Sequence, residues 1–267
     1  MYQIEQVRKG IWWLEGEQHS SFYVVTGSEK AVVIDTGFDE EPILSAIRQV
    51  TDLPLELIIT HGQWDHIYHV DEFQTFGIAK EEDAPFLQQR HDQAVPKWIA
   101  EGDTIELGDT SLQMIALPGH TPGCLLFVDV DRKVVFTGDA IGSGCGVWMQ
   151  IPDGLSIPRY RQALTEAEQK LRSLGVNDQE WLFLGGHKLQ EFTSTVAKPN
   201  PIGMALIADM IVLCDRIIAG EAGERRSTAK QFTEEPVYFA AYGKAEMEYV
   251  KSRIQDGAEE YGTVRSR

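Results

Sequence analysis

The stretch that most restricts what this chain can fold into is IITHGQWDHIYHV, residues 58–70. It places His61, Asp65 and His66 within six residues, directly after the apolar run LELIIT. On extended backbone His61 and Gln63 point the same way, whereas the adjacent Asp65 and His66 must diverge. One short loop can therefore supply ligands to two neighbouring metal ions, and imidazole with carboxylate suits zinc, iron or manganese. The loop begins at the end of an apolar strand, where ligands gather in α/β architectures.

Three glycine-rich turns further along the chain each carry one more candidate ligand. LPGHTPG carries His120, FTGDAIG carries Asp139 and FLGGHK carries His187. Glycine lets the backbone come close to a ligand, and a strand end fixes the side chain that follows it. A single histidine of this kind is in most cases a surface or hydrogen-bonded core residue, so the turns carry weight only as a set.

As a set, these motifs resemble the metallo-β-lactamase-fold hydrolases. That family's signature is T-H-x-H-x-D-H, then His in a P-G-H-T-x-G turn, Asp in a T-G-D turn and a last His in G-H. Here the motifs are THGQWDH, LPGHTPG, FTGDAIG and GGHK, in the family's order, and the resemblance covers roughly residues 10–190. It implies an α/β fold of the αββα sandwich type, with two mixed sheets flanked by helices. The moderately long spacing between Asp139 and His187, with a helix expected between them, resembles the lactonase and glyoxalase II-like branch of the family more than its nucleases.

The resemblance also implies a pair of divalent metal ions, with zinc expected first and iron or manganese as alternatives. Each ion would take three side chains of its own, and the two would share one carboxylate. The implied ligands are His61, Gln63 and His120 for the first ion, Asp65, His66 and His187 for the second, and Asp139 as the bridge.

Gln63 departs from the family pattern, which has a histidine at this position. Its amide oxygen can coordinate a metal, but it is neutral and harder than an imidazole nitrogen. The first site could bind metal weakly, could be empty and leave a mononuclear enzyme, or could have been lost together with activity. We favour a working site, because the other six ligand positions are filled.

Three further residues are candidates for support of the ligands or for the substrate mouth. Asp35, in VVIDTG, matches a family acid that lies behind the ligands. Trp64 lies between the ligands and could form an entrance wall or fill the core. Trp148 follows the Asp139 turn in GVWMQIPDG and could likewise form an apolar wall or belong to the core.

His69 follows His66 by three residues, so on a helix that starts at Asp65 the two would share a face. It could approach the second metal or the substrate mouth. The alternative is a histidine that is hydrogen-bonded on the helix surface.

These residues indicate a metal-dependent hydrolase. A metal lowers the pKa of bound water from 15.7 to about 7, so a metal-activated hydroxide could cleave an ester, lactone, thioester or amide of a small molecule. Asp65 is the expected catalytic residue, accepting a proton as the tetrahedral intermediate collapses. Two alternatives stay open: an iron-dependent oxidoreductase of the same fold, similar to a sulfur dioxygenase, and a catalytically disabled metal-binding module.

Charge and composition narrow the expected partners. A net charge of −17, with no basic run longer than a pair, disfavours binding to nucleic acid or to anionic membranes. The N-terminus lacks the apolar core of a signal peptide, and no segment approaches the roughly 20 apolar residues of a membrane span. The three cysteines are scattered without a Cys-x-x-Cys pair. We expect a cytoplasmic protein.

The chain divides into two parts near residue 198. Residues 1–197 are expected to form the metallo-β-lactamase-like domain, and residues 198–267 a C-terminal helical extension packed on it. Within the extension we expect an apolar helix at 201–219 and a short helix at 244–256. The first helix could also serve as a lid or as the contact of a homodimer.

Overall fold

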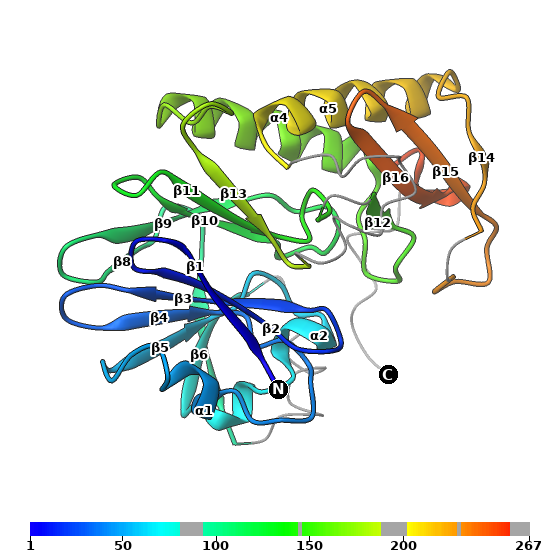
Figure 1. The fold of residues 1–267 in the computed structure, drawn as a ribbon. Helices are drawn as coiled ribbons and strands as arrows, with labels where there is room; N and C mark the ends of the chain where they lie inside the picture. The colour runs from blue at the N-terminus through cyan, green and yellow to red at the C-terminus, as the bar shows by residue number, and fades with distance from the viewer. Residues whose placement is uncertain (81–92, 144–145, 188–201, 229–230, 257–267) are drawn as a thin grey trace.

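Two β-sheets packed face to face form the body of the computed structural model (Figure 1). The structure describes residues 1–80, 93–143, 146–187, 202–228 and 231–256. The first sheet has seven strands, which lie in chain order: β1 (Gln3–Arg8), β2 (Ile11–Glu15), β3 (Ser21–Thr26), β4 (Ala31–Ile34), β5 (Leu55–Ile58), β6 (Thr75–Ala79) and β7 (Val95–Ile99). Its strands pair antiparallel from β1 to β4 and parallel from β4 to β7.

The second sheet has five strands in the order β13 (Leu182–Gly185), β11 (Val134–Gly138), β10 (Leu125–Asp129), β9 (Ser111–Ala116) and β8 (Thr104–Glu106). Only β11 and β13 pair in parallel, and the chain between them runs through helix α4 (Ile157–Ser173). Both sheets are therefore mixed or nearly antiparallel, and the carboxyl ends of β11 and β13 lie at the same edge.

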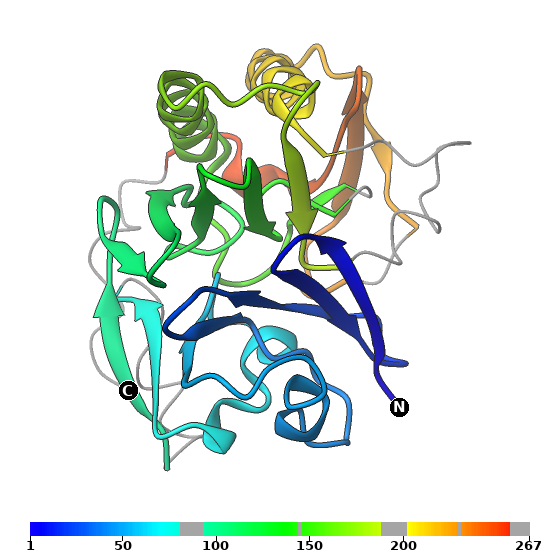
Figure 2. The ribbon, with the colours of Figure 1, turned by 60° about the vertical axis from the view of Figure 1, so that its left-hand side comes forward.

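Helices cover the outer face of each sheet (Figures 1 and 2). Short helices α1 (Leu44–Ile47) and α2 (Trp64–Ile67), with the 3-10 turn η1 (Val70–Glu72), lie on the seven-stranded sheet. The longer helices α4 and α5 (Met204–Ala219) lie on the five-stranded sheet. This arrangement confirms the predicted αββα sandwich.

Because each sheet lies between its partner sheet and a helical layer, its central strands, such as β3, β4, β10 and β11, are buried on both faces. Along β10, Leu125 and Phe127 pack between the sheets, whereas Leu126 and Val128 pack on the helical side. Strands of this kind read as continuous apolar runs rather than as an alternating pattern. The sequence LLFVD of β10 is an example, since all of its residues are buried.

The C-terminal part differs from the prediction, because only α5 in its described residues is an α-helix. It is followed by β14 (Arg225–Arg226), β15 (Val237–Tyr242), β16 (Ala245–Val250) and the 3-10 turn η3 (Lys251–Arg253). The predicted short helix at 244–256 is wrong. Gly243, with φ of 56°, turns the chain back so that β15 and β16 form a hairpin.

This hairpin extends the core rather than standing apart from it. β16 pairs in parallel with β12 (Val147–Met149), which gives a four-stranded sheet in the order β12-β16-β15-β14. The apolar side chains of α5 and of the hairpin join the cluster that covers the five-stranded sheet. Residue 198, the predicted boundary, lies outside the described residues, so the division at that point stays a prediction. Among the described helices, none has the length and apolar character that crossing a bilayer requires.

Candidate metal centre

The predicted ligands come together at one edge of the sandwich, where strands of both sheets end. His61 follows β5 of the first sheet, and Asp139 and His187 follow β11 and β13 of the second. The two sheets touch here, because the Leu125 amide donates to the Thr60 carbonyl at 2.9 Å. The site therefore forms at the seam between the sheets.

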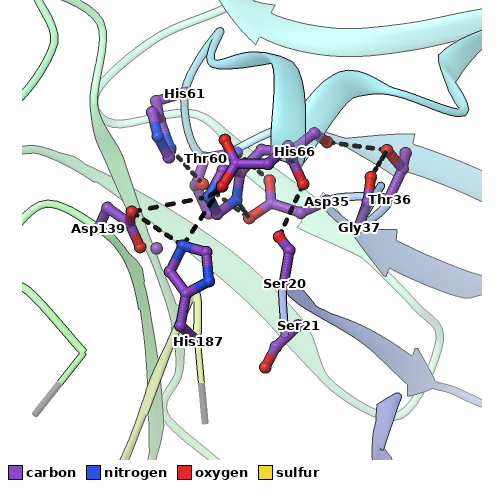
Figure 3. A network of polar contacts seen from close by, with 12 residues as sticks. Ser20, Ser21, Asp35, Thr36, Gly37, Thr60, His61, His66, Asp139 and His187 are labelled. Atoms are coloured by element: carbon purple, nitrogen blue, oxygen red, sulfur yellow. Dashed lines mark hydrogen bonds and ion pairs between the residues drawn. The ribbon is translucent and has the colours of Figure 1, made fainter. Parts of the chain in front are cut away.

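Asp139 occupies the centre of this group. Its Oδ2 lies 3.1 Å from Nε2 of His187, 3.8 Å from Nε2 of His66 and 4.0 Å from Nε2 of His120. Asp65 lies beside it, with Oδ2 3.4 Å from Nε2 of His187 and 3.7 Å from Nε2 of His66. Figure 3 shows Asp139 and His187 directed toward one another, with His61 and His66 alongside.

Two overlapping triplets have the spacing of metal ligands, with donor atoms within 4.8 Å of one another. One consists of His61, His66 and Asp139, and the other of Asp65, His66 and His187. The triplets contain five of the seven predicted ligands, and His120 is the sixth in the group, with its Nε2 4.0 Å from Asp139. Their role as metal ligands stays a prediction.

All four histidines are held through the same ring nitrogen, Nδ1. The atoms that pair with it are Thr60 Oγ1 for His61 at 3.1 Å, Asp35 Oδ2 for His66 at 2.9 Å, the Trp148 carbonyl for His120 at 3.0 Å and the His19 carbonyl for His187 at 2.6 Å. A hydrogen bond at Nδ1 fixes the ring orientation and leaves Nε2 for a metal. Every imidazole is therefore set to present Nε2 to the centre of the group.

Three of these inward nitrogens have no hydrogen-bond partner among the described residues. They are Nε2 of His61, His66 and His120, all buried. Buried polar atoms are nearly always paired, because leaving one unpaired has a free-energy cost. A cation between these nitrogens and the two carboxylates would satisfy them all. The donor set of imidazole and carboxylate fits zinc, iron or manganese, so the residues fit a metal.

Charge coupling inside the group is strong. Burial lowers the pKa of His187, but Asp139 and Asp65 outweigh burial and raise it to about 9. Burial raises the pKa of Asp139, but His187 and His66 outweigh burial and hold it well below its usual value. By contrast, burial, reinforced by His66 and His120, holds the pKa of His61 well below its usual value. The carboxylates of Asp65 and Asp139 therefore stabilise a positive charge on the Asp65 side of the group.

Asp35, the predicted acid behind the ligands, contacts His66 directly and reaches His61 through Thr60. Its Oδ2 accepts from the Thr60 hydroxyl at 2.7 Å and pairs with Nδ1 of His66, and its Oδ1 accepts from the Thr60 amide at 2.7 Å. The Asp35 backbone has φ of 63°, a left-handed conformation that Asp adopts at modest cost. Thr60 was not singled out from the sequence, although it directly precedes His61 and carries its hydroxyl to Nδ1.

Two more residues that sequence reasoning missed lie at the His187 turn. A Cβ on Gly186 would lie 2.3 Å from Oδ1 of Asp139 and 2.7 Å from Cε1 of His66, so any other residue there would displace one of these side chains. Ser143 is buried, and its hydroxyl accepts from the His187 amide at 3.2 Å. The glycine in GGH is a sequence signal for such a close approach, whereas Ser143 has none.

Gln63 is the N-cap residue of α2, next to the group. Burial lowers the pKa of His61 most, and the Gln63 side chain acts in the opposite direction. It is neutral, so on this side of the group Asp139 is the anion. The predicted first site therefore holds less negative charge than the second.

The remaining candidates are Trp64, Trp148 and His69. Trp64 is 43% exposed and packs edge-on against Phe38, with ring centroids 4.2 Å apart. Trp148 gives its carbonyl to His120, and its ring lies 5.2 Å from that of Phe232. Their place at the substrate mouth stays a prediction.

His69 does not belong to the group of predicted metal ligands. Its Nδ1 lies 2.8 Å from Oε1 of Glu72, and its Nε2 lies 2.7 Å from the carbonyl of Asp39. Both ring nitrogens are thus occupied, so the ring has no nitrogen left for a metal. The structure supports the alternative of a hydrogen-bonded histidine at the end of α2.

Comparison with known proteins identifies the family. Residues 15–187 match the model of the Metallo-beta-lactamase superfamily. This range includes every predicted ligand and ends at the last of them.

The sequence is similar to those of two named enzymes. It is 28% identical over 192 residues to hydroxyacylglutathione hydrolase GloC of Haemophilus influenzae, which covers 65% of this chain and 87% of that protein. It is 26% identical over 177 residues to the acyl-coenzyme A thioesterase MBLAC2 of Gallus gallus, covering 51% of this chain and 64% of the thioesterase. The chain therefore spans less than two thirds of the thioesterase's length.

Among solved structures, the metallo-beta-lactamase from Pontibacter korlensis is similar, with a TM-score of 0.59 and 15% sequence identity. The match covers 80% of this chain and 99% of that one. At this level of identity the likeness shows the shared fold alone.

Proposed function

The chain belongs to the metallo-beta-lactamase superfamily, and from this premise we propose that it is a metal-dependent hydrolase of a small molecule with a thioester, ester, lactone or amide bond. One observation carries the proposal: buried histidines, each held at Nδ1, direct unpaired Nε2 atoms toward Asp65 and Asp139. Such an arrangement is costly without a cation and well suited to one.

The proposed metal content is a pair of divalent ions, with zinc as the first expectation. Asp65, His66 and His187 would hold one ion, His61, Gln63 and His120 the other, and Asp139 would serve both. When bound, divalent ions supply Lewis acidity, which lowers the pKa of coordinated water to about 7. Without that acidity the group contains no evident nucleophile.

The two sites are proposed to be unequal. The Asp65 side has two carboxylates within 3.8 Å of the His66 and His187 rings. On the other side, Gln63 adds a neutral amide to the imidazoles of His61 and His120. Because the charge of the ligands governs much of the affinity for a divalent ion, the Asp65 side should fill first and the Gln63 side only at higher metal concentration.

Asp65 is the proposed proton acceptor. It is the first acid of α2, and its side chain is 13% exposed, so it is within reach of solvent and of a bound substrate. The Ser20 hydroxyl donates to the Asp65 carbonyl at 2.7 Å and steadies the start of the helix. Trp64 is its exposed neighbour and would form one wall of the substrate mouth.

Thioesters are the first substrates to test. The two named relatives, a hydroxyacylglutathione hydrolase and an acyl-coenzyme A thioesterase, share the breaking of a thioester bond as their named reaction. The identity is low, and the match to the thioesterase covers 64% of that protein. We therefore propose a thioester without specifying its thiol or its acyl part.

The test is reconstitution of the purified chain with zinc, manganese or iron, followed by assay on a thioester, a lactone and a phosphodiester. We expect metal-dependent thioester or lactone hydrolysis, and an Asp65→Asn variant that loses most of the rate even when it is assayed in excess metal. A chain that is inactive with every metal, beside an active Gln63→His variant, would show a disabled module instead. Stoichiometric iron with an absorbance band, and no hydrolysis, would favour the oxidoreductase.

A further inference from the structure

The turns that carry Asp139 and His187 leave two strands that end side by side. In the parallel pair of β11 and β13, Gly138 lies opposite Gly185. The Gly186 amide then donates to the Gly138 carbonyl at 3.0 Å. The distance between the Asp139 carboxylate and the His187 ring therefore depends on how firmly these two strand ends are held.

A buried tyrosine from the helical layer holds the first of these ends. Tyr160 of α4 is fully buried, and its hydroxyl donates to the carbonyl of Ala140, the residue after Asp139, at 2.7 Å. Its ring lies directly on Gly119, the residue before His120, where an added Cβ would be 2.0 Å from Cδ2 of the ring. One side chain thus touches the turns of two predicted ligands.

A second tyrosine holds the other strand end from the opposite face of the same sheet. Tyr23 of β3 is 3% exposed and packs between the two sheets, with its ring edge-on to Phe136 at 5.2 Å. Its hydroxyl donates to the carbonyl of Gly185 at 2.6 Å. Gly185 is the last residue of β13 and lies two residues before His187.

We propose that Tyr23 and Tyr160 are a pair of positioning residues that fix the Asp139 and His187 turns for metal binding. The inference rests on the proposed metal centre. A metal ligand must be held within about 0.5 Å of its productive place, and side-chain orientation alone does not achieve this if the backbone can shift. The hydroxyls of Tyr23 and Tyr160 each bond a backbone carbonyl near a predicted ligand, so each acts on the backbone.

A merely structural role makes a different prediction from a positioning role. A phenol that only stabilises the fold should lower the melting temperature and leave the metal affinity of the folded chain unchanged. Tyr2 provides the matched control, because its hydroxyl also donates to a backbone carbonyl, that of Glu41. Neither Tyr2 nor Glu41 lies beside a predicted ligand in the sequence or in the described contacts.

The experiment compares the full-length wild type with Tyr23→Phe, Tyr160→Phe and Tyr2→Phe. Zinc affinity is measured by competition with a chromophoric chelator, and thermal unfolding of the metal-free chain is recorded in parallel. We expect Tyr23→Phe and Tyr160→Phe each to raise the zinc Kd about tenfold, the lower end of the effect of groups behind a ligand. Tyr2→Phe should stay within about twofold of wild type. Excess zinc should restore the hydrolytic rate of both site variants.

The inference is overturned if both variants melt earlier but bind zinc as tightly as wild type. If one variant does not fold, the other, which acts from the opposite face of the sheet, decides the question. A wild-type chain that binds no zinc would overturn the metal centre and the tyrosine inference together. Normal wild-type binding with unchanged variants would overturn the tyrosine inference alone.

Discussion

Nε2 of His187 lies 3.1 Å from Oδ2 of Asp139, although 48 residues separate the two in the chain. The contact follows from topology: α4 returns the chain to the edge where β11 begins, so β13 runs parallel to β11 and both strands end at the same edge. The carboxyl ends of parallel strands meet at one edge of a sheet, so the residues after them become neighbours. Asp139 is thereby placed between His187 and the histidines of the other sheet, the position that the proposed bridging carboxylate would require.

Asp35→Asn should weaken metal binding without unfolding the chain. Asn also tolerates the left-handed backbone of Asp35, but its NH₂ group cannot accept hydrogen bonds as a carboxylate oxygen does. The contact with either Thr60 or His66 is then lost. We expect a 10- to 100-fold rise in the Kd for zinc, measured by chelator competition.

Asp178→Asn is the control for this variant. The Asp178 carboxylate likewise accepts two backbone amides, those of Met204 and Ala205 at the start of α5. This change should lower stability and leave zinc affinity as it is. Equal affinities for Asp35→Asn and wild type would contradict the role given to Asp35.

Gly186→Ala should abolish metal binding at a small cost in stability. The added methyl group would lie 2.3 Å from the Asp139 carboxylate and 2.7 Å from the His66 ring, so one of them must move. Gly102→Ala is the control variant. Gly102 has open space around it, but its φ of 86° is strained for alanine. Calorimetric titration with zinc, beside thermal melts, should show binding lost in the first variant and only stability lost in the second.

Glu72→Gln should destabilise the fold in a pH-dependent way. Oε1 and Oε2 of Glu72 accept from the Ile43 and Leu44 amides at 2.9 and 3.0 Å, so Glu72 caps α1, whose own N-cap side chain makes no such bond. Burial raises the pKa of Glu72, but hydrogen bonds from His69 and these amides outweigh burial and lower it below the usual 4.5. We expect a loss of about 1 kcal/mol at pH 7, comparable to other helix caps.

The sign of the pH effect follows from the lowered pKa. A carboxylate with a lower pKa in the folded state contributes stability above its unfolded pKa and loses it as pH falls through the folded value. Urea unfolding of wild type and Glu72→Gln should therefore differ at pH 7 and converge as pH falls below about 4.5. A difference that grows toward low pH would contradict this interpretation.

Arg132→Met should cost about 3 kcal/mol of stability and leave the activity of the folded protein unchanged. Arg132 links the sheets far from the metal group: its guanidinium donates to the Thr26 carbonyl at 2.8 Å and lies 3.7 Å from the fully buried Asp129 carboxylate. Its removal leaves Asp129 with only neutral partners, the Thr110 hydroxyl and a backbone amide. Urea unfolding of the double variant with Asp129→Asn should recover part of the loss.

The extent to which the sequence predicted the candidate site differs from residue to residue. His61, Asp65, His66, His120, Asp139 and His187 were recoverable because each stands in a motif with its own glycines or at fixed spacing. Their supports were harder to predict: Thr60 is the first residue of the motif THGQWDH, but Tyr23 and Tyr160 lie in ordinary apolar patterns of a strand and a helix. Nothing local marks them, because their importance comes from strand ends far away in the sequence.

The misassigned segment at 245–250 shows the same limit. Its sequence AEMEYV contains good helix formers, which favours a helix on local grounds. Pairing with β12, 100 residues earlier, and the left-handed turn at Gly243 make this segment a strand. Partners so distant in the chain override local propensity, and a sequence read locally does not reveal them.

The most direct test of the account is the number of metal ions that the chain retains. Wild type and Gln63→His would be loaded with zinc, dialysed against metal-free buffer, and analysed for metal by mass spectrometry. The account predicts about one zinc ion per wild-type chain, a second only in excess zinc, and two retained by Gln63→His. A wild-type chain that holds no metal even in excess zinc, while folded, would contradict it.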